Sequence, residues 1–156
     1  MRIAVAFDHR GVALRDAVLE ALAGHDVVDL GTDSPEVRVD YPDKARQVGE
    51  AIQSGGVERA VLVCGSGVGA AVAACKMAGI RASICHDVYS AHQGVEHDDM
   101  NVLCLGSEVV GASVARELVA AFVGATFNTV ESRYAARLEK VAAMEKEMKG
   151  GAFTAA

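Results

Sequence analysis

The chain has 156 residues, of which 51% are hydrophobic and 23% are charged, and its formal net charge is −6. These values are typical of one globular domain and exclude a disordered or low-complexity chain. The negative charge, four Phe, three Tyr and no Trp argue against a nucleic-acid or anionic-membrane binder and against platforms for base stacking.

Neither a membrane span nor a signal peptide is expected. The longest uncharged run, residues 60–75, has 16 residues and three glycines, whereas a span needs about 20 apolar residues. The chain enters a strand-like run directly after Met1. The four cysteines are Cys64, Cys75, Cys85 and Cys104. Their spacing fits no zinc or CxxC pattern, so we expect reduced thiols in a cytoplasmic protein.

Short β-branched runs alternate with helical patterns along the chain. In the helical segments, apolar residues recur every three or four positions, and glycine or proline marks several ends. Strands are predicted at residues 2–7, 26–30, 60–64, 80–85 and 101–105. Helices are predicted at residues 14–22, 42–54, 68–77, 88–95, 110–122 and 130–149.

This alternation predicts an α/β fold with three layers, in which helices cover both faces of a five-stranded parallel sheet. The expected strand order is the flavodoxin-like 2-1-3-4-5, in the Rossmann-like group. This order opens a ligand crevice between the carboxyl ends of the first and third strands. Residues 1–149 are expected to form one domain, and residues 150–156 a flexible tail. The charged last helix is expected to pack on a partner subunit.

A glycine-rich turn, residues 65–69, links the third strand to the next helix. Its amides could converge on an anion at the helix N-terminus. The turn is not a P-loop, and Ala70 stands where a dinucleotide fingerprint requires glycine. The alternative reading is a tight turn that needs a positive φ.

Cys64 comes directly before this turn. A thiol at a helix N-terminus ionises readily, so Cys64 could be a nucleophile or a base. It could equally be a small buried apolar residue, which is the expected state of the other three cysteines.

Histidines and arginines provide further candidates. Asp8 and His9 could form an acid–base pair or cap a helix. His97 is expected in a loop before the fifth strand, and His86-Asp87 at the surface. Arg133 and Arg137 lie four residues apart and share a helix face, which suits either a phosphate site or a solvated surface.

Several segments together resemble the type B ribose-5-phosphate isomerases, in the wider group that includes galactose-6-phosphate isomerase subunits. The matching segments run the length of the chain. They are residues 6–9, 40–42, 64–69, 76–82, 96–98, 101–103 and 106–107, with Arg133 and Arg137.

The resemblance implies aldose–ketose isomerisation of a sugar phosphate through an enediol, without metal or cofactor. Ribose 5-phosphate and ribulose 5-phosphate of the pentose phosphate pathway are the expected pair. Cys64 would be the base that moves a proton between C2 and C1, and His97 the acid that opens the furanose ring. Family sites lie at a subunit interface, so a homodimer or tetramer is expected.

The resemblance also implies the substrate contacts. Asp8 and Ser66 would hold sugar hydroxyls, and Tyr41 would line the pocket. The enediolate would be stabilised by the amides of the turn. These are the amides of Gly65, Ser66, Gly67, Val68 and Gly69. The phosphate would bind His9, Arg133 and Arg137.

Three positions depart from common family patterns. Ala70 replaces the glutamate of one branch and leaves Cys64 as the base. Asp98, a candidate substrate contact, replaces a frequent asparagine, and Glu108 replaces a frequent basic residue. A four- or six-carbon substrate, of the erythrose-4-phosphate or galactose-6-phosphate type, therefore stays open. So does a non-catalytic sugar-phosphate-binding module. A metal-dependent isomerase using Asp8, His9, His97 and Asp98 is disfavoured because ligand spacing is absent.

Overall fold

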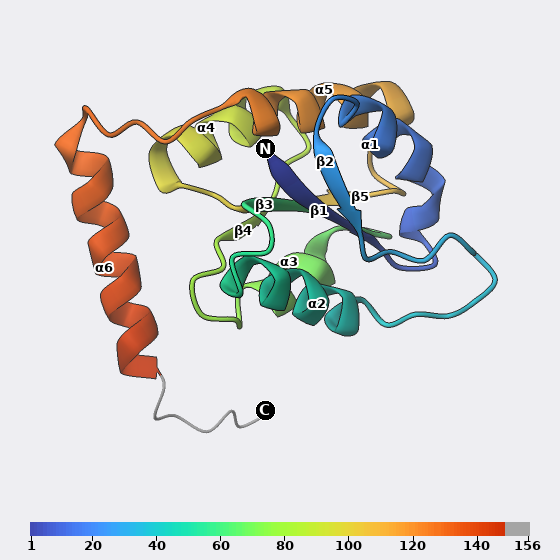
Figure 1. Ribbon diagram of the computed structural model, residues 1–156, viewed down its shortest axis with the longest axis horizontal. Helices are drawn as coiled ribbons and strands as arrows, with labels where there is room; N and C mark the ends of the chain where they lie inside the picture. Colours follow the sequence, from blue (N-terminus) through green and yellow to red (C-terminus); the bar gives the residue numbers. More distant parts are fainter. Residues whose placement is uncertain (149–156) are drawn as a thin grey trace.

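The computed structural model describes residues 1–148, in which a five-stranded parallel sheet carries helices on both faces (Figure 1). The strands are β1 (Arg2–Phe7), β2 (Asp26–Asp29), β3 (Arg59–Cys64), β4 (Ala82–Ile84) and β5 (Val102–Gly106). The helices are η1 (Gly11–Leu14), α1 (Arg15–Ala21), α2 (Tyr41–Gln53), α3 (Val68–Ala74), α4 (Val88–Asp98), α5 (Ala112–Gly124) and α6 (Ser132–Met148). The predicted three-layer α/β class is confirmed. The predicted tail, residues 150–156, lies outside the described residues.

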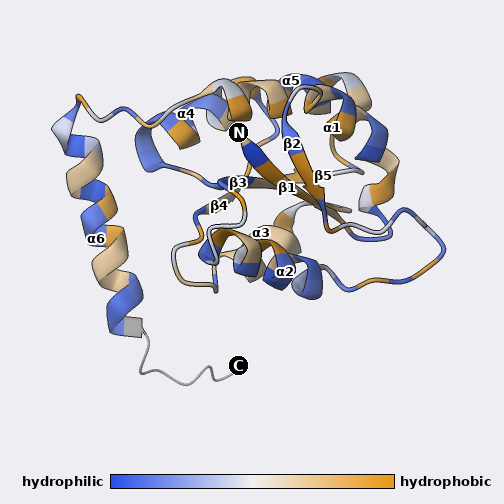
Figure 2. Ribbon diagram, viewed as in Figure 1, coloured by the Kyte–Doolittle hydropathy of each residue, from blue (hydrophilic) through white to orange (hydrophobic). Residues whose placement is uncertain are grey.

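The two faces of the sheet bury side chains of different size. In β1, Ile3, Val5 and Phe7 pack toward α1, α4 and α5. The alternate residues Ala4 and Ala6 pack toward α2 and α3, where small side chains let the helices approach closely. Figure 2 shows apolar colour along much of β1, between helices of mixed polarity. Burial on both faces explains why the central strands are continuously apolar.

The observed strand order is 2-1-3-5-4, so the predicted order is wrong in its last two strands. All five residues of β5 are buried, and β5 pairs with both β3 and β4. In contrast, β4 has three residues, and Ser83 at its centre is exposed. The more apolar strand therefore takes the interior position and the short, more polar one the edge. The predicted pairing of β1 with β3 is confirmed.

Helix α4 is longer than predicted and places His97 in its last turn, so the predicted loop position of His97 is wrong. The helix ends at Asp99, whose φ is 47°. Arg81 fixes this turn, because its Nε donates to the Asp99 carbonyl at 2.6 Å and its Nη2 to the Asp99 carboxylate at 2.5 Å. These two bonds hold Asp99 in the left-handed conformation, which glycine ordinarily adopts at the end of a helix.

His86 and Asp87, both expected at the surface, differ in burial. The His86 ring is half-buried, and its Nε2 accepts a bond from the Gly106 amide at 3.2 Å. Asp87 is exposed and caps α4 by accepting from the Ser90 amide at 2.7 Å. This bond lowers the pKa of Asp87.

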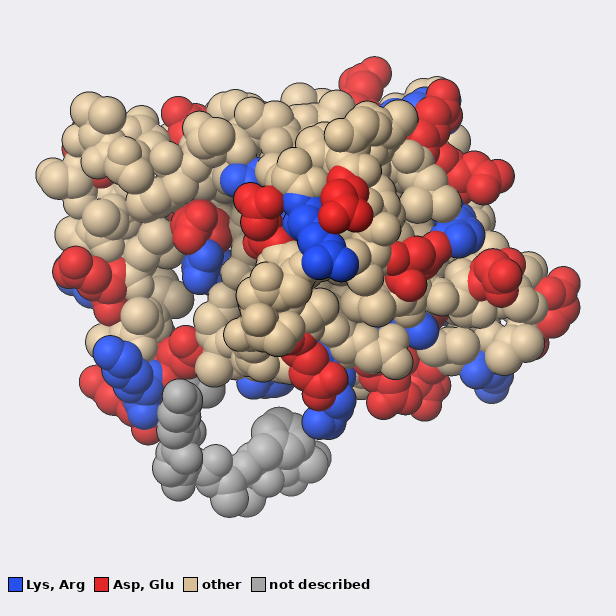
Figure 3. Space-filling view, viewed as in Figure 1, with Lys and Arg blue, Asp and Glu red and all other residues tan. Residues whose placement is uncertain are grey.

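Helix α6 stands beside the main body and contacts it at few points (Figure 1). Tyr134 is buried against His97 near the start of α6, and Glu145 accepts a bond from the Gly79 amide at 2.7 Å. On the face shown in Figure 3, acidic and basic side chains are interspersed. None of the helices within residues 1–148 is long and apolar enough to cross a membrane.

Candidate active site

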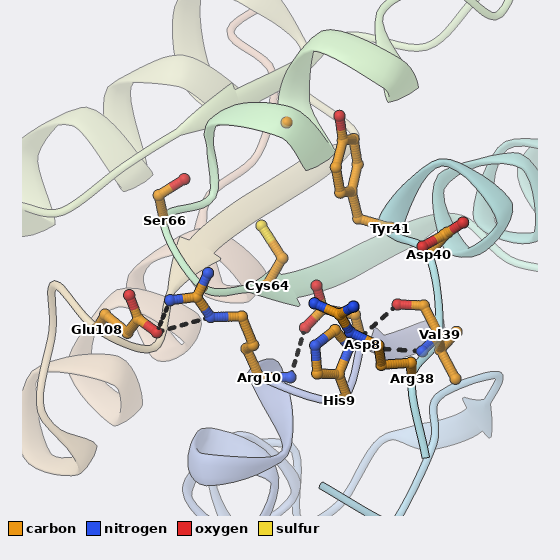
Figure 4. Close-up of a pocket in the computed structure, with 12 residues that line it drawn as sticks. Asp8, His9, Arg10, Arg38, Val39, Asp40, Tyr41, Cys64, Ser66 and Glu108 are labelled. Carbon is orange, nitrogen blue, oxygen red and sulfur yellow. Dashed lines mark hydrogen bonds and ion pairs between the residues drawn. The ribbon is translucent and has the colours of Figure 1, made fainter. Parts of the chain in front are cut away.

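A pocket of about 420 Å³ opens at the carboxyl ends of β1 and β3, where the topology predicted a crevice (Figure 4). It is lined by seven of the predicted site residues. These are Asp8, His9, Tyr41, Cys64, Gly65, Ser66 and Gly69. The remaining lining residues are Arg10, Arg38, Val39, Asp40 and Glu108, which sequence reasoning did not assign to the site.

Cys64 is the last residue of β3, and 4% of its surface is exposed. The Gly67 amide donates to the Cys64 Sγ at 3.2 Å. Gly67 has a φ of +80°, which confirms the predicted turn with positive φ and aims this amide back at the sulfur. The turn therefore places a backbone N–H donor directly against the Cys64 sulfur.

The neighbouring glycines make room for pocket side chains. A Cβ at Gly65 would lie 2.9 Å from the Arg10 Nε, and a Cβ at Gly69 would lie 2.6 Å from the Tyr41 ring. The Val68 amide donates to the Ser66 hydroxyl at 3.3 Å. The glycine-rich turn therefore brings Arg10 and Tyr41 close to the Cys64 loop.

Asp8 follows β1 and is buried, with 4% of its surface exposed. Its Oδ1 accepts bonds from the Arg10 amide at 2.9 Å and the Gly11 amide at 2.8 Å, so the carboxylate holds the turn that leads into η1, whose N-cap residue is Arg10. The Nδ1 of His9 lies 3.2 Å from the Val39 carbonyl oxygen. This contact ties the end of β1 to the loop of residues 31–40, which forms one wall of the pocket.

An ion pair between Arg10 and Glu108 closes another side of the pocket. The Arg10 Nε donates to the Glu108 Oε1 at 2.7 Å, and Nη2 donates to the same oxygen. The Glu108 amide donates to the Gly65 carbonyl at 2.9 Å, and the Ser107 hydroxyl to the Arg10 carbonyl at 2.9 Å. The two partners lie 98 positions apart, so no local sequence signal could have revealed the pair.

Four predicted site residues lie elsewhere in the same chain. His97 and Asp98 belong to the last turn of α4, and Arg133 and Arg137 belong to α6. Helix α4 leads from the carboxyl end of β4 back to the amino end of β5. It therefore ends near the amino ends of the strands, whereas Cys64 lies at the carboxyl end of β3. One chain therefore does not bring these residues to its own Cys64 pocket.

Two of these residues, His97 and Arg133, meet at Tyr134. The His97 ring stacks on Tyr134 with centroids 4.1 Å apart, and its Nε2 lies 2.9 Å from the Tyr134 hydroxyl. The His97 Nδ1 lies 2.8 Å from the Gln93 amide nitrogen. Arg133 donates to the Tyr134 hydroxyl at 3.3 Å, and this bond raises the pKa of Arg133. Arg137 is exposed.

The structure separates the four cysteines by environment, and all four are free. Burial raises the pKa of the Cys85 thiol and raises that of the Cys104 thiol well above its usual value. Cys75 is exposed at the end of α3, so its predicted burial is wrong.

Asp8 and His9 line the pocket, whereas His97 and Asp98 end α4 at the opposite sheet edge. Among residues 1–148, no three His, Cys, Asp or Glu side chains form a group that could hold a metal ion.

Comparison with known proteins identifies the family. The family model for ribose/galactose isomerases matches residues 3–141. Ribose-5-phosphate isomerase B of Escherichia coli (strain K12) is 42% identical over 147 residues, which cover 93% of this chain and 97% of that protein. D-erythrulose-4-phosphate isomerase 2 of Mycolicibacterium smegmatis is 36% identical over 149 residues, which cover 93% and 97%. The structure of Clostridium thermocellum ribose-5-phosphate isomerase B matches with a TM-score of 0.90 and 38% identity, covering 96% of this chain and 100% of that one. The chain therefore belongs to the ribose/galactose isomerase family.

Proposed function

We propose that this sugar-phosphate isomerase interconverts ribose 5-phosphate and ribulose 5-phosphate, and that residues 1–149 form its single catalytic domain. The observation that carries the proposal is the placement of Cys64 in the pocket, with the Gly67 amide 3.2 Å from its sulfur. Family membership supports the reaction class. The name of the E. coli relative, at 42% identity, supports the five-carbon substrate.

Cys64 acts as the base. Its thiolate takes the proton from C2 of the open-chain aldose, and the resulting thiol returns the proton to C1. The O2 hydroxyl proton passes to O1 in the same sequence, which gives the ketose. Negative charge develops on the substrate oxygen during this transfer. The amides of residues 65–69 border the thiol and stabilise this charge, as in an oxyanion hole. The isomerisation transfers the C2 proton to C1 and the O2 hydroxyl proton to O1 within one molecule, with no net oxidation, so the proposed mechanism uses no cofactor.

The remaining pocket residues orient the sugar. Asp8 uses Oδ1 to bind the Arg10 and Gly11 amides at the start of η1, and its carboxylate lines the pocket as an acceptor for a sugar hydroxyl. Ser66 is exposed on the loop beside Cys64 and takes a second hydroxyl. Tyr41, packed on Gly69, forms an apolar wall. His9 lies on the side of the loop of residues 31–40 and contacts the phosphate.

A second copy of the chain completes the site. His97 opens the furanose ring as an acid, Asp98 contacts the sugar, and Arg133 and Arg137 bind the phosphate. In one chain these residues lie at the sheet edge opposite Cys64. They can therefore reach the substrate only across a subunit interface, in a homodimer or a tetramer of such dimers.

Exposed apolar side chains support this assembly. On α3, directly after the glycine-rich turn, Val68 is 53% exposed and Val72 is 58% exposed. On α6, Val141 is 51% exposed and Met144 is 61% exposed. Aliphatic side chains on two helices that flank the two halves of the site are suited to burial against a second copy.

A four-carbon substrate is the second candidate, because the M. smegmatis relative, at 36% identity, is a D-erythrulose-4-phosphate isomerase. A turnover screen over four-, five- and six-carbon aldose phosphates decides between them. The proposal predicts the highest kcat/KM for ribose 5-phosphate. A higher value for a tetrose phosphate would replace the substrate, and binding without turnover of any of them would identify a sugar-phosphate-binding module.

A further inference from the structure

We propose that Arg10 binds the phosphate group of the substrate from the subunit that supplies Cys64, and that Glu108 holds the Arg10 guanidinium in position. This inference rests on the proposed function, because it takes the substrate to be a sugar phosphate. It assigns a substrate contact to Arg10, a residue that sequence reasoning left without a role.

The Arg10 side chain lines the pocket beside the glycine-rich turn. It leaves the chain two residues after Asp8, and its guanidinium packs over Gly65. A Cβ at Gly65 would lie 2.9 Å from the Arg10 Nε and 3.1 Å from its Cζ. Figure 4 shows the guanidinium between Glu108 and Cys64, close to Ser66. A positive charge is thus held beside the loop that carries the thiol.

In the free chain the guanidinium is already paired with Glu108, and the two side chains are 54% and 56% exposed. Both Nε and Nη2 donate to one oxygen of Glu108, and the Glu108 backbone is itself bonded to Gly65. The Arg10 Nη1 makes no hydrogen bond with any group in residues 1–148, so its two N–H bonds are available to a ligand. A planar guanidinium with free donors suits a phosphate oxygen, and prior positioning lowers the entropy lost on binding.

The charges that line the pocket favour such a contact. Three carboxylates line it, from Asp8, Asp40 and Glu108, and they repel a phosphate dianion. The pocket has one other arginine, Arg38, which is exposed on the loop of residues 31–40 and has no ion-pair partner within residues 1–148. Arg10 is therefore the arginine that the fold itself holds in place. In the proposed assembly, Arg10 contacts the phosphate from the subunit that supplies Cys64, and Arg133 and Arg137 contact it from the second copy.

The test measures binding of inorganic phosphate by isothermal titration, together with KM for ribose 5-phosphate. Arg10→Gln should raise the Kd for phosphate and the KM by at least about tenfold, because a charge-assisted contact is lost and Glu108 is left unpaired. Arg10→Lys should recover part of the affinity, since it restores the charge without the planar fork. The double variant R10Q/E108Q should bind phosphate more tightly than R10Q, because the unpaired carboxylate is gone.

Arg116→Gln provides the matched control. Arg116 forms an exposed ion pair with Glu20 at 3.1 Å, between α5 and α1 and outside the pocket. This variant should keep the wild-type Kd and KM. An unchanged Kd for phosphate in folded R10Q would overturn the proposal and show that Arg10 and Glu108 form only a surface ion pair. If wild type turns over no pentose phosphate while R10Q still weakens phosphate binding, the proposed function fails and the assignment of Arg10 stands.

Discussion

Replacing Cys64 by serine removes the proposed base with little change in shape. The serine hydroxyl can accept the Gly67 amide bond that now reaches Sγ at 3.2 Å, so the loop should keep its conformation. A hydroxyl ionises far above neutral pH and cannot take the C2 proton. General base catalysis contributes about 10²–10⁴-fold, so kcat should fall by this factor, or about 3–5 kcal/mol of barrier.

The assay compares initial rates of ribose 5-phosphate isomerisation for wild type, C64S and C75S. Cys75 is exposed and lies outside the pocket, so C75S should retain the wild-type kcat. Iodoacetamide should alkylate Cys64 and Cys75, and a bound sugar phosphate should protect Cys64 alone. If C64S isomerises as fast as wild type, Cys64 is not the base, and Asp8 or Asp98 would have to move the proton.

Two further predictions concern α6 and the core. Arg137→Ala should raise KM by about tenfold or more through loss of a charge-assisted phosphate contact. Unphosphorylated ribose should be a poor substrate for the same reason. The control variant Lys140→Ala, on the same helix, should keep the wild-type KM. A wild-type KM in R137A would show that Arg137 belongs to a solvated helix face. Burial raises the pKa of Cys104, so the folded chain keeps this proton above about pH 8.5, where the unfolded chain loses it. The free energy of unfolding should therefore decrease as pH rises above this value, by up to about 1.4 kcal/mol per pH unit from this thiol. The free energy of unfolding is measured by urea denaturation at pH 8, 9 and 10. It should decrease less with rising pH for Cys104→Ala than for wild type, and an equal decrease in both would refute the linkage.

Much of the fold could be predicted because local pattern and tertiary role agree. The continuously apolar β3 and β5 are buried on both faces, and the glycine-rich turn has the positive φ that its composition indicated. The positions of β4 and β5 could not be derived from chain order, because they depend on which strand is buried more completely. The end of α4 was missed because it is set by Arg81, 18 residues from Asp99.

The candidate site divides in the same way. Asp8 directly follows β1 and Cys64 ends β3, and both were predicted from topology because the carboxyl ends of parallel strands lie on the same side of a sheet. The pairing of Arg10 with Glu108 was missed because the two residues lie 98 positions apart in the chain. Arg10 and Cys75 both show that side-chain exposure and pairing depend on neighbours distant in sequence.

Complementation between two inactive variants tests the shared site most directly. Chains carrying C64S and chains carrying H97Q are co-expressed in equal amounts, and light scattering confirms that each variant alone forms the wild-type assembly. Random pairing of equal amounts makes half of the dimers mixed. If Cys64 and His97 of one site come from different subunits, each mixed dimer has one intact site. The mixture should then recover about a quarter of the wild-type activity per chain. Activity no higher than the average of the two separate variants would contradict a site built from two copies of the chain.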